Sequence, residues 1–202
     1  MSDVFALLDE IRAIGRTGLH YCDDPFDRAR YERLLELAGQ EFAERSGLDE
    51  PAVRARFDAE IGYQTARVGA DAAVFDDDDR LLLVRRVDDG KWGLIAGWVD
   101  PNESPAQTVV RELEEEAGVR GRVERLVGAF FREACTGEHP HGTVSVVYLC
   151  SILGGNLQPQ AHEVHEVAWR RIDEIDADAW HLNHATLARA ALDANWRLRS
   201  GL

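Results

Sequence analysis

Three glutamates near the middle of the chain have a spacing that brings their carboxylates together. Glu112, Glu115 and Glu116 lie three and four residues apart, which places them on one face of a helix. Like charges at this spacing repel one another, and a divalent cation would neutralise them. Carboxylate oxygens suit Mg²⁺ or Mn²⁺, and Mg²⁺ completes its shell with waters and substrate phosphates. The spacing fits a metal platform for phosphate chemistry. It also fits a solvated acidic helix face, which is the commoner case.

The segment from Gly97 to Val119 surrounds these glutamates. Ser104 and Pro105 are typical of a helix start and Gly118 of a helix end, which predicts a helix over 105–117. The predicted buried face of this helix consists of Ala106, Val109 or Val110, Leu113 and Ala117. The whole segment resembles the Nudix box, G-x5-E-x7-R-E-U-x-E-E-x-G-U with U aliphatic, at every specified position.

The resemblance to the Nudix hydrolase family covers about residues 66–200 and implies its α/β/α sandwich with a mixed sheet. By motif position it implies that the carboxylates of the three box glutamates are metal ligands, with Glu115 and Glu116 also counted as catalytic. The backbone carbonyl of Gly97 is implied to complete the metal shell. Arg111, also assigned to the catalytic group, is implied to form a buried ion pair with Glu103 that orients the loop and the helix. Gly118 is implied to be structural.

The resemblance also implies a further carboxylate from a late loop, acting as catalytic base or extra metal ligand. Glu163 and Glu166 both lie shortly before Trp169, and Glu163 has the spacing often found in the family. We prefer Glu163 for this role. Glu166, or one of the box glutamates, remains an alternative base.

Basic and aromatic side chains near the box are candidates for holding a substrate. Arg85 and Arg86 end the strand before the box, and alternation sends them to opposite faces, so at most one is expected to reach the phosphates. We select Arg85, and Arg132 is a similar candidate. Trp92 follows a polar turn and is the preferred aromatic residue for stacking on a nucleobase.

The rest of the chain reads as a helical segment followed by a mixed α/β unit. Apolar periodicity predicts helices over residues 4–14, closed by Gly15 and Gly18, then from Pro25 to near Gly47, and a short one over 51–57. Strands are predicted over 68–75, 80–87, 123–132, 143–152 and 164–171, with a last helix over 183–197. The segment 138–142 is predicted to be a surface loop. We place the domain boundary between 65 and 66.

The N-terminal segment indicates a substrate class. Its opening over residues 8–21 resembles the helical extension on certain bacterial Nudix enzymes that hydrolyse X-linked nucleoside diphosphates, including CDP-choline pyrophosphatases. We expect Mg²⁺- or Mn²⁺-dependent cleavage of a CDP-choline- or ADP-ribose-like substrate into a nucleoside monophosphate and phosphorylated X. A MutT-type nucleoside triphosphate pyrophosphohydrolase is the alternative. A non-catalytic nucleotide sensor is the alternative from another class.

Composition limits the partners and the compartment. The 202 residues carry 23 Lys+Arg against 37 Asp+Glu, a formal net charge of -14, which disfavours a general nucleic-acid binder. No signal peptide or membrane-spanning run is read, so no membrane partner is expected. Three well-separated cysteines fit a reducing cytoplasm. The helical segment buries little alone and is expected to pack on the rest of the chain or form a homodimer.

Overall fold

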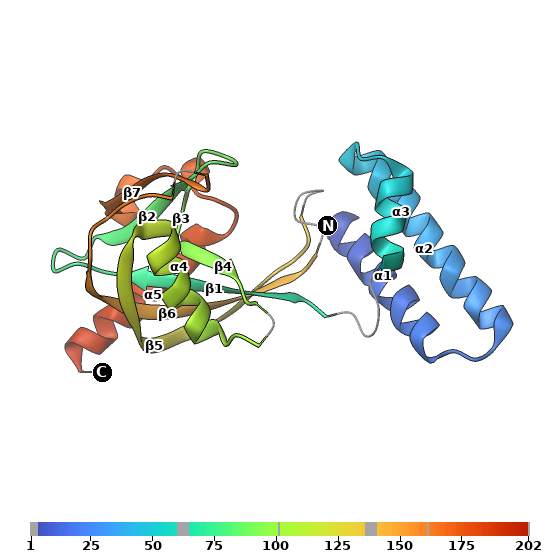
Figure 1. Cartoon of the computed structure of the whole chain (residues 1–202), viewed down its shortest axis with the longest axis horizontal. Coiled ribbons are helices and arrows are strands. Elements are labelled where there is room, and N and C mark those ends of the chain that lie inside the picture. The colour runs from blue at the N-terminus through green and yellow to red at the C-terminus, as the bar shows by residue number, and fades with distance from the viewer. Residues whose placement is uncertain (1–3, 60–64, 101, 136–140, 161, 202) are drawn as a thin grey trace. The chain divides into compact units, whose positions relative to one another are not determined.

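The computed structural model describes residues 4–59, 65–100, 102–135, 141–160 and 162–201. The chain forms two compact units, which we describe separately (Figure 1). The helical unit comprises Met1–Arg67 together with Phe131–Thr143. The sandwich unit comprises Val68–Phe130 together with Val144–Leu202. The predicted domain boundary between 65 and 66 stays a prediction.

The helical unit contains α1 (Val4–Tyr21), α2 (Pro25–Ser46) and α3 (Glu50–Ala59). Asp24 caps α2 by accepting hydrogen bonds from two backbone N–H groups, and Pro25 opens the first turn. Gly47 ends α2 with a left-handed φ of 71°. The core shared by the three helices consists of Leu8, Ala38, Phe42, Ala43, Val53 and Phe57.

The prediction that Gly15 and Gly18 close the first helix is wrong, because α1 continues through both to Tyr21. The two glycines serve packing instead. A Cβ on Gly15 would lie 2.9 Å from the Leu35 side chain, and one on Gly18 would lie 2.4 Å from the Tyr31 ring. Their missing side chains let α2 approach α1 closely, at a helix-propensity cost of about 1 kcal/mol each.

The segment Phe131–Thr143 belongs to the helical unit through a buried polar cluster. His141 Nδ1 lies 3.1 Å from Arg12 Nη2 and 3.2 Å from Asp9 Oδ1. Gly142 N–H donates to Asp9 at 3.0 Å. Burial would raise the pKa of Asp9, but hydrogen bonds from His141, Arg12 and Gly142 lower it to about 2. His141 is buried, so the predicted surface loop is wrong at this residue; its residues 138–140 lie outside the described ranges.

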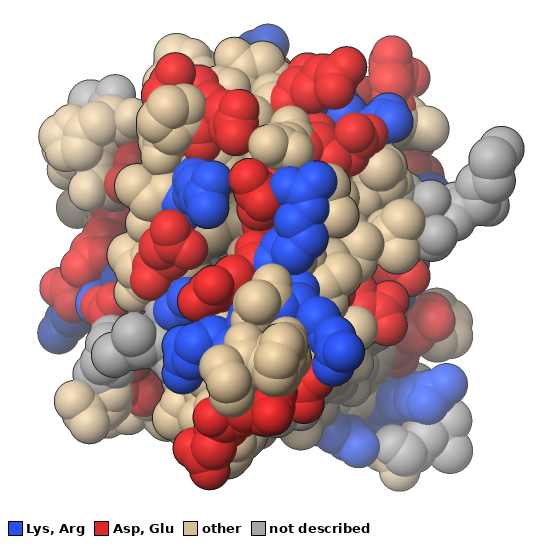
Figure 2. Space-filling view, turned by 90° about the vertical axis from the view of Figure 1, so that its right-hand side faces the viewer, with Lys and Arg blue, Asp and Glu red and all other residues tan. Residues whose placement is uncertain are grey.

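Charged side chains of both signs alternate over the face of the molecule shown in Figure 2. On α2, Arg30 pairs with Asp27 and Arg33 with Glu36, each three residues apart. These exposed pairs add polar groups to the surface of α2. No helix in the described part of the chain is long and apolar enough to cross a membrane.

The sandwich unit contains two sheets. The four-stranded sheet has the order β4-β1-β6-β5, and the three-stranded sheet has the order β3-β2-β7. The strands are β1 (Arg67–Val74), β2 (Leu81–Arg86), β3 (Trp92–Gly93), β4 (Ile95–Trp98), β5 (Val119–Arg132), β6 (Thr143–Gly155) and β7 (Val164–Arg170). Strands β3 and β4 are nearly consecutive but pair with different sheets, so the chain crosses between the sheets at Leu94.

Two helices cover the sheets, α4 (Pro105–Ala117) and α5 (His184–Ser200). Val109 and Leu113 of α4 pack with Leu82 of β2 in one core. Leu187 of α5 packs with Leu81 of β2 in the other. Because neighbouring residues of a strand face opposite sides, α4 and α5 lie on opposite sides of β2. The predicted α/β/α sandwich is confirmed.

The predicted element boundaries agree closely with the structure at the 105–117 helix and differ elsewhere. Strand β5 begins at Val119, directly after the Gly118 cap, and not near residue 123. Strand β6 extends to Gly155 and α5 to Ser200. Two short 3₁₀ turns, Ile172–Glu174 and Ala177–Ala179, were not predicted; runs this short leave little periodicity to detect.

Candidate active site

Helix α4 is fixed at both ends by its own sequence. Ser104 accepts from the Gln107 backbone N–H, and the Gln107 side chain accepts from the Ser104 backbone N–H. Pro105 occupies the first turn. Gly118 ends the helix with φ 72°, a conformation that other residues adopt with strain. The positions of the glutamates along α4 are therefore set locally.

Arg111 joins the loop before α4 to the carboxylates on the helix. Its Nε and Nη2 donate to the two carboxylate oxygens of Glu103, at 3.1 and 3.0 Å. Nη1 donates to Glu112 at 2.6 Å and to Glu115 at 2.9 Å. The bond from Arg111 is the largest influence lowering the pKa of Glu103 to about 2. The predicted ion pair between Arg111 and Glu103 is present, but the two side chains are 29% and 17% exposed, so the pair is half-buried and not buried as predicted.

The three box glutamates have different environments. Glu112 and Glu116 are buried, although the sequence placed them away from the buried face, whereas the Glu115 side chain is 50% exposed. Burial raises the pKa of Glu116 to about 8, against the opposing hydrogen bond that Ala96 N–H donates to it at 3.1 Å. Burial also raises the pKa of Glu112, and Arg111 opposes this change. Two buried carboxylates with raised pKa values fit a divalent cation, which would stabilise their charged forms.

Gly97 is required by the approach of α4 to strand β4. A Cβ at this position would lie 1.8 Å from Glu112 Oε1 and 2.3 Å from its Cδ. Only glycine therefore lets the β4 backbone lie directly against the Glu112 carboxylate. The Gly97 carbonyl is on the same short strand, which fits its predicted role as a metal ligand. That role stays a prediction.

Glu163 and Glu166, the two candidates for the additional carboxylate, have different surroundings. The charge of Glu163 raises the pKa of both Glu112 and Glu116, so Glu163 is close enough to act on them. Its backbone carbonyl accepts from Val87 N–H at 2.9 Å, which ties it to the end of β2. Glu166 instead pairs with Arg170 at 3.2 Å. These placements favour Glu163 over Glu166 as the additional carboxylate.

The three residues predicted to hold the substrate make different contacts within the protein. Arg85 Nε donates to the Gly90 carbonyl at 3.0 Å, and the Trp92 ring packs 5.1 Å from the Arg170 guanidinium carbon. Arg132 belongs to the helical unit, where it donates to Thr143 Oγ1 at 3.0 Å. All three assignments stay predictions. Arg86, which was not selected, lowers the pKa of Glu116 through its charge, and a register irregularity falls between Arg85 and Arg86.

The sequence did not predict a buried polar network on the side of the sandwich that α5 covers. His184 Nδ1 accepts from Leu94 N–H at 3.0 Å, so Nδ1 carries no proton and His184 is neutral. Its Nε2 lies 3.9 Å from the buried carboxylate of Asp71. Burial raises the pKa of Asp71 to about 7, although a hydrogen bond from Ser145 opposes this. The available signal was the single aspartate inside the apolar run of β1.

The network holds the crossover strand from the side opposite α4. His184 binds Leu94 N–H and Glu116 binds Ala96 N–H, so two side chains from different helices fix the backbone leading to Gly97. Within the described ranges, one group of three metal-capable side chains has all its ligand atoms within 4.8 Å, namely Asp88, Asp89 and His181. Arg86 pairs with Asp88, and His181 with Asp89. Glu112, Glu115 and Glu116 do not form such a group, because their carboxylate oxygens are not all within 4.8 Å of one another and Arg111 bonds to two of them.

The sandwich and its carboxylate-bearing helix define the Nudix class of folds, and comparison with known proteins agrees. Residues 65–191 match the NUDIX domain family model, and the chain belongs to this family. Residues 2–57 match the model described as a UDP-X-like, N-terminal oligomerisation domain.

Relatives bear pyrophosphatase names. A solved structure of UDP-X diphosphatase is 26% identical, with a TM-score of 0.55, and the match covers 96% of this chain and 93% of that chain. An ADP-ribose pyrophosphatase structure from Streptococcus suis 89-1591 is 30% identical over 65% of this chain and 92% of that one, with a TM-score of 0.54. A putative ADP-ribose pyrophosphatase, YjhB of Bacillus subtilis (strain 168), is 37% identical over 58% of this chain and 56% of its own length. The chain thus spans about half the length of that curated relative.

Proposed function

We propose that this protein is a divalent-metal-dependent hydrolase that cleaves the pyrophosphate of a nucleoside diphosphate linked to a second moiety X. Water adds across the P–O–P linkage and gives a nucleoside monophosphate and a phosphorylated X. The observation that carries the proposal is the pair of buried carboxylates, Glu112 and Glu116, set against Gly97. Such a pair is costly to bury unless a cation binds.

Each functional group has a proposed role. Glu112, Glu115, Glu116 and the Gly97 carbonyl would hold Mg²⁺ or Mn²⁺, which when bound polarises phosphoryl oxygens. The Glu163 carboxylate accepts a proton from the attacking water, a role supported by its charge coupling to the buried glutamates. Arg111 keeps the glutamates and the preceding loop in register. Arg85, Trp92 and Arg132 remain the proposed substrate contacts.

The substrate class is supported by the N-terminal match. The UDP-X-like family model covers residues 2–57, and the UDP-X diphosphatase structure matches nearly the whole chain. A nucleoside-diphosphate-X substrate is therefore preferred over a triphosphate. A MutT-type activity is the second candidate, because a MutT-like protein of Streptomyces ambofaciens is 33% identical over 108 residues.

A hydrolysis panel tests the proposal. UDP-glucose, CDP-choline, ADP-ribose, NADH and dATP are incubated with Mg²⁺ and then Mn²⁺, and the products are separated by chromatography. Glu115→Gln is compared with Glu114→Gln, a matched change on the same helix outside the proposed metal set. We expect monophosphate and phosphorylated X from a diphosphate substrate, lost in Glu115→Gln and kept in Glu114→Gln. Cleavage of dATP alone would support the MutT-type candidate, and equal activity of both variants would refute the metal assignment.

We also infer a homodimer formed through the helical unit, in the cytoplasm. The match of residues 2–57 to an oligomerisation domain supports the dimer. The free cysteines Cys22, Cys135 and Cys150 fit a reducing compartment. The mass in solution, measured by light scattering during gel filtration, tests the dimer independently of the hydrolysis panel.

A further inference from the structure

The outer face of α1 carries a regular apolar stripe. Leu7, Ile14 and Tyr21 are seven residues apart and are 49%, 51% and 69% exposed. Residues at this interval lie on one face of a helix, about two turns from one another. Glu10 and Thr17 fall between them on the same face. The opposite face is buried within the helical unit at Leu8, Arg12 and Gly15, so the stripe is a second, separate surface of α1.

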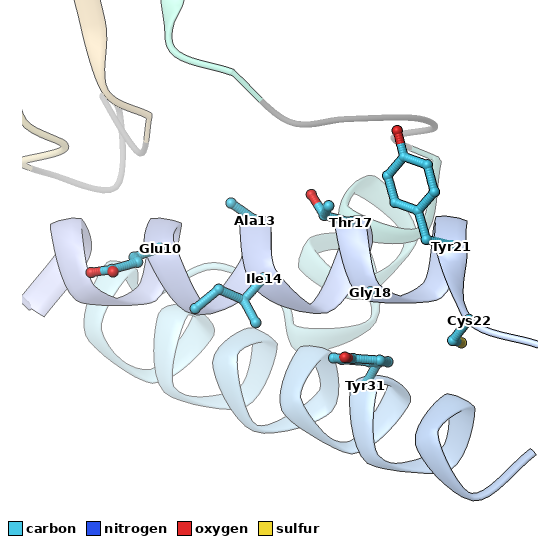
Figure 3. A pocket seen from close by; sticks show the side chains of 8 residues that line it. All are labelled: Glu10, Ala13, Ile14, Thr17, Gly18, Tyr21, Cys22 and Tyr31. Carbon is cyan, nitrogen blue, oxygen red and sulfur yellow. The ribbon is translucent and has the colours of Figure 1, made fainter. Parts of the chain in front are cut away.

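A hollow of about 500 Å³ runs beside this stripe (Figure 3). Part of its lining is the Tyr31 ring of α2, which lies directly against Gly18 because Gly18 has no side chain. The residues that line it are Glu10, Ala13, Ile14, Thr17, Gly18, Tyr21, Cys22 and Tyr31. Glu10 is the one charged residue in this set, although the protein has a formal net charge of -14. A surface this low in charge can meet a second copy of itself with little repulsion.

We propose that the stripe binds the same stripe of a second copy, with the two α1 helices antiparallel and Ile14 on the two-fold axis. This inference rests on the homodimer proposed above and adds its surface and symmetry. The spacing is self-complementary, because Leu7 precedes Ile14 by seven residues and Tyr21 follows it by seven. An antiparallel pair centred on Ile14 therefore sets each Leu7 against Tyr21 of the second copy. An isologous contact of this kind closes as a dimer.

The antiparallel register also accommodates Glu10, the one charged residue that lines the hollow. Glu10 lies four residues from Ile14, or about 6 Å along the helix, so the two Glu10 side chains are separated by about 12 Å along the axis. Each faces the region of Thr17 and Gly18 on the second copy, where a hydroxyl is available as a hydrogen-bond donor. A parallel arrangement would instead bring the two carboxylates together. The antiparallel register is therefore favoured by charge as well as by apolar spacing.

A charge substitution on the axis tests the surface. Ile14→Glu places two carboxylates against each other, and we expect the dimer to become a monomer in light scattering. Leu37→Glu is the matched control, since Leu37 is 45% exposed on α2 and does not line the hollow. It should remain dimeric, and circular dichroism should show both variants folded. A dimeric Ile14→Glu protein would overturn the surface while leaving the homodimer intact, and a monomeric native protein would overturn both.

Crosslinking tests the symmetry without relying on dissociation. In a Cys22→Ser, Cys135→Ser background, Ile14→Cys should join to itself with a short bis-maleimide reagent. Leu7→Cys alone should not, because the two positions would lie about 21 Å apart along the axis. Co-expressed Leu7→Cys and Tyr21→Cys chains should crosslink to each other. Crosslinking of Leu7→Cys with itself would overturn the antiparallel register.

Discussion

Replacing Asp71 by asparagine should stabilise the sandwich unit, and the gain should grow with pH. Asp71 is buried on β1, accepts a hydrogen bond from Ser145 and faces a neutral His184. The substitution keeps the size of the side chain and its capacity to bond with Ser145, but it removes the titration. It therefore isolates the cost of placing one carboxylate in the interior.

The magnitude follows from the two pKa values of Asp71. Its ordinary pKa is 3.8, and burial raises it to about 7 in the folded protein. Between these values the native state keeps a proton that the unfolded chain has released, so stability falls as the pH rises. A difference of about 3 between the pKa values corresponds to about 4 kcal/mol above pH 7. About 2 kcal/mol of this is already lost at pH 5, which leaves about 2 kcal/mol between pH 5 and pH 8.

Urea unfolding followed by tryptophan fluorescence provides the assay. All five tryptophans, at positions 92, 98, 169, 180 and 196, lie in the sandwich unit, so the signal reports the unit that contains Asp71. We expect Asp71→Asn to exceed the native protein by at most about 4 kcal/mol at pH 8 and by about half of that at pH 5. Asp77→Asn, in an exposed turn, should follow the native curve. Free energies of the native protein and Asp71→Asn that run parallel from pH 5 to pH 8 would refute the reasoning.

Three further predictions concern the site and the helical unit. Gly97→Ala should displace the Glu112 carboxylate and lower kcat by on the order of 10–100-fold with the circular dichroism spectrum unchanged; an unaffected kcat would contradict the close packing. Glu163→Gln should lower kcat by about 100-fold or more with KM little changed, whereas Glu166→Gln should stay near native, and the reverse order would reassign the base. The native helical unit should lose stability as the pH falls from about 4 to about 2, because the folded pKa of Asp9 is the lower one; Asp9→Asn should reduce this dependence in thermal unfolding, leaving the part due to Glu36, whose pKa Arg33 also lowers, and an unchanged dependence would contradict the role of Asp9.

Local signals predicted the helix that carries the site. Ser104, Pro105 and Gly118 are contiguous in sequence with the elements they delimit, and the observed helix has the predicted bounds. The contact between Glu103 and Arg111 was also predicted, because the box fixes their separation. The motif does not specify how deeply each glutamate is buried. Two of its glutamates are buried and one is not, and this depends on how closely β4 approaches α4.

Long-range pairings escaped the sequence for a physical reason. His184 and Leu94 are 90 residues apart, and His141 and Asp9 are 132 apart, so no periodicity relates them. The glycines of α1 were misread because local propensity treats glycine as a helix terminator, whereas tertiary packing against α2 decided their role. Glycine inside an otherwise periodic helix was a packing signal in this chain.

Strand β2 has a consequence for how the sandwich unit opens. Its residues 81–84 are fully buried, with alternate side chains in the two cores that α4 and α5 cover. A strand shared in this way cannot leave one core without vacating the other, so the two cores should unfold as a single cooperative unit. Backbone amides of β2 should then be among the slowest to exchange with deuterium. The carboxylate site lies on one side of β2, but its rigidity therefore depends on packing on both sides of this strand.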